Sequence, residues 1–227
     1  VDDPTHPINV ITLYDSLKNK FYSWGTKPYE TTNIGTANSK INKDDIIYYH
    51  CKTEVEMLRR YIDYVMIDYP DIVTGWNSEL FDIPYIICRM GRVLDENEYK
   101  KLSPVGDVYC REIAGQFGRT RYRWFIKGVA SLDYLDIYKK FSMGLRPNYK
   151  LDTIAEIELG DKKIDYGNIN LAQLADENWK TFVDYNIQDV NLLVQMEEKL
   201  QYLKLLRMLA YVGLAPLESA MGTLTVI

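Results

Sequence analysis

The segment from Ile46 to Met90 alternates the patterns of strands and helices, and this constrains the fold more than any other feature of the chain. Residues 46–51 are apolar and aromatic, as in a buried strand. Thr53 and Glu56 then have the Ser/Thr-x-x-Glu spacing of a capping box, which predicts a helix to about residue 68. A strand followed directly by a capped helix is typical of α/β proteins with parallel strands, so we expect that fold class.

The same pattern repeats after Pro70, which ends the first helix. Residues 71–76 read as a second strand, and Asp82 begins a second helix that reaches at least to Met90. Asp82 and Asn77 are thereby placed at the carboxyl end of a strand, where open α/β sheets bind ligands. Asp82 equally suits a simple structural role as the N-cap of that helix.

The remaining chain contains weaker signals. Residues 8–14 and 20–24 read as paired strands, and 26–45 as a loop. A hairpin and a further strand are expected within residues 107–140, and 131–141 fits either a strand or a helix. Further helices are expected at 150–159, at 177–204 with Asp176 as the N-cap, and as a buried helix within 202–217.

Tyr185 and Asp189 lie four residues apart in the expected helix, so their side chains share one face. A carboxylate there can ligate a metal ion, and a phenol one turn earlier can bind a water molecule. The alternative is structural: Tyr185 as a half-buried aromatic and Asp189 as a solvated charge.

Composition excludes several classes of site. The net charge of −5 argues against a duplex binder held mainly by phosphate neutralisation. Cys51, Cys88 and Cys110 share no Cys-x-x-Cys spacing, which argues against a zinc site or a disulfide framework and favours a reducing cytoplasm. With 227 residues, the chain is expected to form one domain, or one domain with an appendage, and it has no long uncharged apolar run that predicts a membrane span.

Residues 119–128 interleave cations with aromatic side chains. In a strand, alternation would place Tyr122 and Trp124 on one face and Arg121 and Arg123 on the other. Such a hairpin suits contact with phosphates and stacking on bases, which contributes about 1–3 kcal/mol per base. The alternative is a hairpin whose apolar face packs on the domain.

Two of these segments resemble a known family. Gly-Trp-Asn-x-x-x-Phe-Asp at 75–82 and Tyr-x-x-x-Asp at 185–189 resemble the second and third motifs of the proofreading 3′→5′ exonuclease of family B DNA polymerases. Residues 132–141 are similar to a stretch of the T-even-type phage members, and 149–155 to a helix of the family. The resemblance implies a ribonuclease H-like exonuclease fold, a mixed sheet flanked by helices, with an inserted β-hairpin.

The resemblance also implies roles and cofactors. Asp189 and Asp82 would ligate two divalent metal ions, Mg²⁺ or Mn²⁺, and Tyr185 would orient the attacking water. Asn77 and Phe81 would contact the terminal nucleotide. The hairpin would touch DNA through a set of cations and aromatic rings: Arg119, Arg121, Tyr122, Arg123 and Trp124.

The first motif of the family, Asp-x-Glu, has no counterpart in the sequence. Asp2 and Asp3 resemble the segment that follows this motif and are poor substitutes for it. Three explanations are open: a preceding segment of a longer protein carries the motif, a separate chain supplies it, or the domain has lost it. We expect a fragment or partner of a larger polymerase that is weak or inactive as a nuclease by itself.

The expected organisation is an exonuclease domain at 1–205 and the start of a linker toward a polymerase palm at 206–227. The expected partners are the 3′ end of single-stranded DNA, the remaining polymerase and a sliding clamp, in the cytoplasm of a host cell. The alternative function is a non-catalytic module that binds single-stranded nucleic acid. A stand-alone exonuclease acting on short RNA is disfavoured by the linker and the hairpin.

Overall fold

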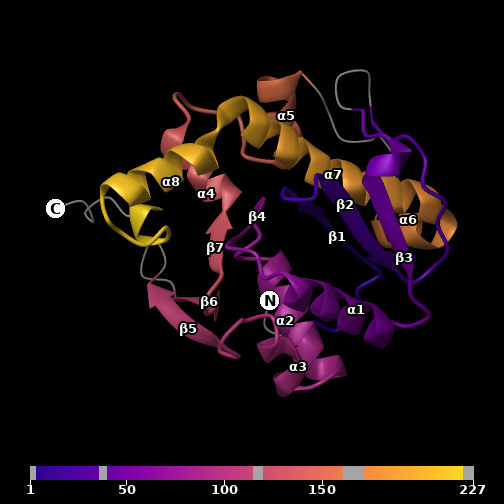
Figure 1. Ribbon diagram of the computed structural model, residues 1–227. Helices are drawn as coiled ribbons and strands as arrows, with labels where there is room; N and C mark the ends of the chain where they lie inside the picture. Colours follow the sequence, from indigo (N-terminus) through magenta and orange to yellow (C-terminus); the bar gives the residue numbers. More distant parts are fainter. Residues whose placement is uncertain (1–3, 36–39, 115–119, 161–170, 222–227) are drawn as a thin grey trace. The chain divides into compact units, whose positions relative to one another are not determined.

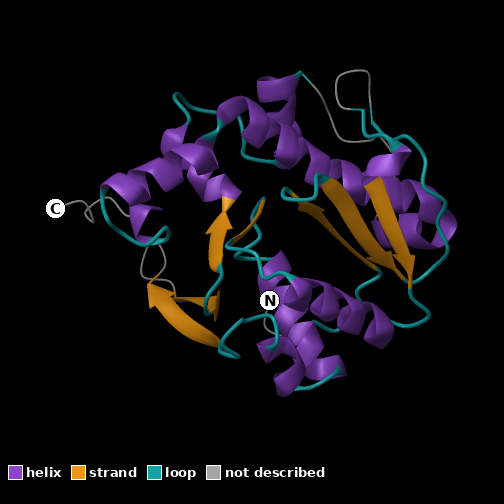
Figure 2. Ribbon diagram, in the orientation of Figure 1, coloured by secondary structure: helices purple, strands orange, loops and turns teal. Residues whose placement is uncertain are grey.

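The computed structural model describes residues 4–35, 40–114, 120–160 and 171–221 (Figure 1). It is a mixed α/β structure, as the sequence predicts, with the helices and strands shown in Figure 2. Its contacts divide the chain into two compact units. The first unit comprises Val1–Pro7, Leu58–Met143 and Gln201–Ile227, and the second comprises Ile8–Met57 and Gly144–Leu200.

The second unit is built on a three-stranded sheet. Strands β1 (Val10–Asp15) and β2 (Lys20–Gly25) form the expected antiparallel hairpin, with Ile11 opposite Trp24. Strand β3 (Ile46–His50) runs parallel to β2, so the loop between them crosses from one end of the sheet to the other. The predictions of these strands are confirmed. The loop predicted over 26–45 ends in a 3-10 turn at Lys43–Asp45, and its residues 36–39 lie outside the described part of the chain.

Helix α7 (Trp179–Leu200) packs against this sheet. Its Val183 and Ile187 are fully buried in a core with Phe21 and Ile46. Helices α5 (Leu151–Leu159) and α6 (Leu171–Glu177) complete the unit by packing on α7.

The prediction of a single helix over 177–204 is wrong at both ends, because α7 begins at Trp179 and ends at Leu200. Asp176 lies inside α6, and Asn178 caps α7 instead by accepting a hydrogen bond from the Thr181 N–H at 3.1 Å. Asn and Asp are about equally good N-caps, so the sequence did not distinguish the two positions. The helix stops where Gln201 adopts a left-handed φ of 53°, at a position with no Gly or Pro to signal it.

The first unit contains two strand pairs. Strand β4 (Ile72–Gly75) runs parallel to β7 (Ala130–Asp133), while β5 (Val108–Ala114) and β6 (Thr120–Ile126) form the expected antiparallel hairpin. Helix α1 (Glu54–Ile67) crosses the division between the units. The other helices of the first unit are α2 (Asp82–Val93), α3 (Glu96–Lys100), α4 (Tyr134–Phe141) and α8 (Tyr202–Val212).

The capping box is confirmed in its first half. The Glu56 N–H donates to the Thr53 hydroxyl at 3.2 Å, while the Glu56 carboxylate reaches back to the Lys52 N–H at 2.8 Å. The sequence of residues 131–141 fits either a strand or a helix. In the structure these residues form a strand up to Asp133 and a helix from Tyr134.

The expected buried helix within 202–217 is only partly buried. Leu206 and Ala210 enter a core with Leu132 and Ile137. The helix ends at Val212, and Tyr211, Val212 and Leu214 are exposed. No helix in the described part of the chain is long and apolar enough to cross a membrane.

Gly128 lies in the turn that joins the β5–β6 hairpin to β7, and substituting it tests how much this turn contributes to stability. Its φ is +85°, and an added Cβ would lie 2.5 Å from Pro104 Cγ. We expect Gly128→Ala to lower the free energy of unfolding by about 3 kcal/mol, from backbone strain and overlap together. Gly106→Ala is the matched control, since φ is +70° there with open space around the Cβ, and about 1 kcal/mol is expected. Urea denaturation of both variants checks this, and equal losses would contradict it.

Candidate functional site

The loop between β4 and α2 carries the first group of candidate residues. It begins with a tight turn at Gly75, where an added Cβ would lie 2.7 Å from the Ser78 Cβ. Asn77 then adopts a left-handed φ of 63°, which Asn tolerates better than most residues. The Asn77 carbonyl accepts from the N–H groups of Leu80 and Phe81, at 3.3 and 3.1 Å, so the loop closes on itself before α2.

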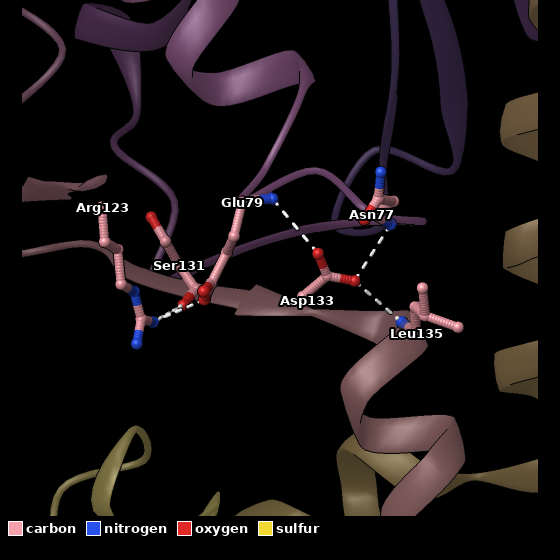
Figure 3. A network of polar contacts seen from close by, with 6 residues as sticks. All are labelled: Asn77, Glu79, Arg123, Ser131, Asp133 and Leu135. Atoms are coloured by element: carbon pink, nitrogen blue, oxygen red, sulfur yellow. Dashed lines mark hydrogen bonds and ion pairs between the residues drawn. The ribbon is translucent and has the colours of Figure 1, made fainter. Parts of the chain in front are cut away.

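Asp133, the last residue of β7, holds this loop in place (Figure 3). Its Oδ1 accepts from the Asn77 N–H at 3.0 Å and from the Leu135 N–H at 2.9 Å, and its Oδ2 accepts from the Glu79 N–H at 3.2 Å. The side chain is buried, and burial raises the pKa of its carboxyl, although the three N–H donors oppose that shift. One carboxylate therefore fixes two points of the loop and also caps α4.

A second contact holds the loop through the Glu79 side chain. Arg123 of β6 donates from Nη2 to Glu79 Oε1 at 2.5 Å and to the Ser131 carbonyl at 3.1 Å (Figure 3). Burial raises the pKa of Glu79 to about 7, and the nearby Arg123 guanidinium only partly opposes this rise. The negative charge of Asp133 adds to it.

The raised pKa of Glu79 predicts a pH dependence of stability. The folded protein keeps the proton on Glu79 at pH values where the unfolded chain has already released it, so the free energy of unfolding falls as pH rises from about 4.5 to about 7. We expect this fall to be on the order of 2 kcal/mol larger in the unaltered protein than in Glu79→Gln. Urea denaturation at a series of pH values measures it, and parallel curves for the two proteins would contradict it.

Asp82 is the first residue of α2 and is exposed. The N-cap position belongs to Phe81, so the alternative in which Asp82 caps the helix is wrong. A carboxylate in the first turn is favoured by the positive end of the helix dipole. The Phe81 ring is also exposed and lies 5.9 Å from the Tyr85 ring, centroid to centroid. Asp82 and Phe81 are therefore accessible on one helix end.

Tyr185 and Asp189 lie one turn apart on α7 in the second unit. Tyr185 is buried and Asp189 is partly buried, so neither matches the structural alternative of a half-buried aromatic and a solvated charge. The neighbouring Asp184 is held by the Tyr29 hydroxyl at 2.6 Å and the Lys180 ammonium at 2.5 Å. These contacts fasten the turn that carries Tyr185.

The candidate residues belong to two different units. Asp82 and Asn77 belong to the first unit, and Tyr185 and Asp189 to the second. Carboxylates are the donors that Mg²⁺ and Mn²⁺ prefer. Among the residues that the structure describes, however, no three or more acidic, Cys or His side chains form a group that could hold a metal ion.

The β5–β6 hairpin contains the remaining candidates. Tyr122 is exposed, whereas the Trp124 ring packs edge-on against Tyr99 at 5.9 Å. On the other face, the Arg123 guanidinium lies 5.2 Å from the Phe125 ring. Arg119 lies outside the described residues, as do Asp2 and Asp3, and only the backbone of Arg121 is described.

Residues 8–154 match the family described as the exonuclease domain of family B DNA polymerases. The chain belongs to this family. The resemblance stated from the sequence is confirmed, and the matched exonuclease-domain residues include the loop of Asn77 and Asp82 and the hairpin.

Individual family B relatives agree. The chain is 34% identical to the DNA-directed DNA polymerase of Escherichia phage RB69 over 94% of this chain, and 30% identical to that of Enterobacteria phage T4 over 96%. It is 24% identical to the DNA polymerase of Bombyx mori nuclear polyhedrosis virus over 74% of this chain. The chain spans about a quarter of the length of the two phage relatives, at 25% and 26%, and 17% of the third.

Two residues of this exonuclease domain were missed in the sequence. Asp133 was recognised only as part of a strand-or-helix stretch, although an Asp between a strand and a helix is a typical N-cap. Glu79 gave no signal, because its partner Arg123 lies 44 residues away on a hairpin interpreted as a DNA contact.

Proposed function

We propose that this chain is the 3′→5′ proofreading exonuclease module of a viral or phage replicative DNA polymerase, with a ribonuclease H-like fold. Its substrate would be the 3′ end of single-stranded DNA, and the reaction would be two-metal phosphodiester hydrolysis with Mg²⁺ or Mn²⁺. The observation that carries the proposal is the family match over residues 8–154. Divalent metal ions in such a reaction polarise the phosphate and lower the pKa of the attacking water.

Asp82 and Asp189 are proposed as metal-ligating carboxylates, and Tyr185 as the residue that orients the attacking water. Asn77 and Phe81 are proposed to contact the terminal nucleotide. The accessibility of Asp82 and Phe81 supports these roles, as does the one-turn spacing of Tyr185 and Asp189. Further carboxylates are proposed to come from a segment that carries the family's Asp-x-Glu motif, which has no counterpart in this sequence.

The remaining polymerase is the proposed main partner, with a palm and N-terminal segments, and a sliding clamp as a further partner. We propose that residues 1–205 form the exonuclease domain and that 206–227 lead toward the palm, in a protein that acts in the host cytoplasm. The phage relatives are about four times as long as this chain, which supports a larger assembly. The exposed Tyr211, Val212 and Leu214 are apolar surface that such an assembly would cover.

The proposal is tested by the shortening of a 5′-labelled single-stranded oligonucleotide. Two proteins are compared, the chain by itself and the chain joined at its N-terminus to a segment that carries the family's Asp-x-Glu motif, here called the joined protein. We expect slow or no shortening by the chain and rapid removal of nucleotides from the 3′ end by the joined protein. EDTA should abolish it. A joined protein that folds and binds the oligonucleotide but does not shorten it would overturn the proposal.

The second candidate function is a non-catalytic module that binds single-stranded nucleic acid. The observation that favours it is that the family's Asp-x-Glu motif has no counterpart in this sequence. It predicts equal oligonucleotide binding with and without Mg²⁺ and no shortening in either protein. The comparison of the two proteins therefore separates the two functions.

The hairpin's role in DNA binding rests on Tyr122, whose ring is 60% exposed. We expect Tyr122→Ala to weaken binding of single-stranded DNA by about tenfold, the loss of one stacked base, with little change in stability. Trp124→Ala should instead destabilise the protein, because its ring packs against Tyr99. Fluorescence anisotropy and urea denaturation of both variants measure the two effects. Unchanged affinity in Tyr122→Ala would show that the exposed ring does not contact DNA.

A further inference from the structure

Glu79 and Arg123 connect two parts of the first unit that serve different proposed roles. Glu79 lies in the loop that leads to Asp82, and Arg123 lies in the middle of β6, in the proposed DNA-binding hairpin. Their side chains are only 16% and 25% exposed. A partly buried pair of this kind is screened less by salt than a fully exposed ion pair.

Glu79 is held at both ends. Its backbone N–H donates to Asp133, and its carboxylate accepts from Arg123 (Figure 3). Asn77, two residues earlier, donates to the same Asp133 carboxylate. The position of the loop therefore depends on β7 through Asp133 and on the hairpin through Arg123.

The guanidinium of Arg123 has capacity for a further acceptor. Its Nη2 serves Glu79 and the Ser131 carbonyl, and 25% of the side chain is exposed, so part of the fork is accessible to an acceptor from outside. A guanidinium offers five N–H donors in a fork that matches a phosphate. A phosphodiester that reached the hairpin would bind the same group that now holds Glu79.

We propose that the Glu79–Arg123 ion pair is a positioning link, through which a DNA strand bound to the β5–β6 hairpin changes the order of the loop that carries Asn77 and precedes Asp82. This inference rests on the proposed function, because it takes the hairpin as a DNA contact. Glu79 is a positioning residue in this scheme and touches neither DNA nor metal. The link couples the two sites through one shared guanidinium.

Hydrogen exchange of the loop amides tests the link. Exchange of a peptide covering residues 74–82 is measured by mass spectrometry at about pH 8, above the raised pKa of Glu79. It is compared with and without a single-stranded oligothymidylate, in the unaltered chain, Glu79→Gln, Arg123→Met and the double variant. We expect DNA to change the exchange rate of this peptide by at least about fivefold in the unaltered chain. Neither single variant should show that change, and the double variant should lose no more than the single ones.

Lys127→Met is the matched control. Lys127 follows β6 and pairs with Asp107 at the base of the same hairpin, so this variant removes one cation and one ion pair without touching the loop. Its loop exchange should still respond to DNA. Arg123→Lys, which keeps the charge but not the fork, replaces Arg123→Met if the latter fails to fold, and it should also lose the response.

Anisotropy measured on the same samples separates the possible failures. If the unaltered chain does not bind the oligothymidylate, both the proposed DNA contact and the link are overturned. If it binds but the loop peptide exchanges at the same rate, the link alone is overturned. The link is likewise overturned if the Glu79→Gln and Lys127→Met variants respond alike to the oligothymidylate.

Discussion

In the joined protein, Asp82→Asn and Asp189→Asn should each reduce oligonucleotide shortening on the order of 10³-fold, because each removes a charged oxygen donor from the proposed metal chemistry. Asparagine keeps the size and one oxygen of the side chain, so the local fold should persist. Tyr185→Phe should have a smaller effect, on the order of tenfold to a hundredfold, because a phenol that orients water contributes less than a metal ligand. Gel analysis of shortening rates at saturating oligonucleotide measures all three.

Affinity for the oligonucleotide and the free energy of unfolding are the controls for these variants. Asp184→Asn is a matched variant, since Asp184 is also a carboxylate of α7 but is engaged by Tyr29 and Lys180. Asp184→Asn should lower the free energy of unfolding. The rate at which the folded variant shortens the oligonucleotide should stay within a few-fold of the rate of the unaltered protein. Equal loss of shortening activity in Asp184→Asn and Asp189→Asn would contradict a specific role of the Asp189 carboxylate. It would mean that activity depends on the integrity of α7.

The parts of the fold that were predictable are those with local signals. The hairpin of β1 and β2, the capping box at Thr53 and the strand-to-helix order of residues 46–90 all follow from spacing and composition over short windows. The helix break at Gln201 was not predictable, because no Gly or Pro stands there and the apolar pattern continues through it. Tertiary packing of Leu206 and Ala210 on another core accounts for the new helix.

The sequence proposes the motif residues of the candidate site but gives no signal for the residues that hold them in place. Asp82, Tyr185 and Asp189 were selected because carboxylates and a phenol occur at recognisable spacings. Glu79 and Arg123 pair over 44 positions, and such a long-range contact leaves no trace in a single sequence. The alternative role of Asp82 as an N-cap failed for a local reason: the loop closes on the Asn77 carbonyl, so the cap position falls on Phe81.

Asp133→Ala should lower the free energy of unfolding by about 3 kcal/mol. The variant leaves three backbone N–H groups, those of Asn77, Glu79 and Leu135, without their acceptor in a buried place, and each such loss costs about 1–3 kcal/mol before water compensates. Asp133→Asn keeps one acceptor oxygen, but its NH2 group replaces the other oxygen and faces a backbone N–H, so that two donors meet. We therefore expect an intermediate loss of free energy of unfolding. Urea denaturation measures the free energies.

Asp95 supplies the comparison that isolates burial. Asp95 caps α3 and accepts from the N–H groups of Asn97 and Glu98 at 2.7 and 3.2 Å, but it is exposed, so water can replace it. Asp95→Ala should therefore cost only about 1 kcal/mol. Hydrogen exchange of the loop peptide should accelerate in Asp133→Ala and not in Asp95→Ala. Similar losses in both variants would mean that Asp133 acts as an ordinary helix cap and that the loop before Asp82 is held by other contacts.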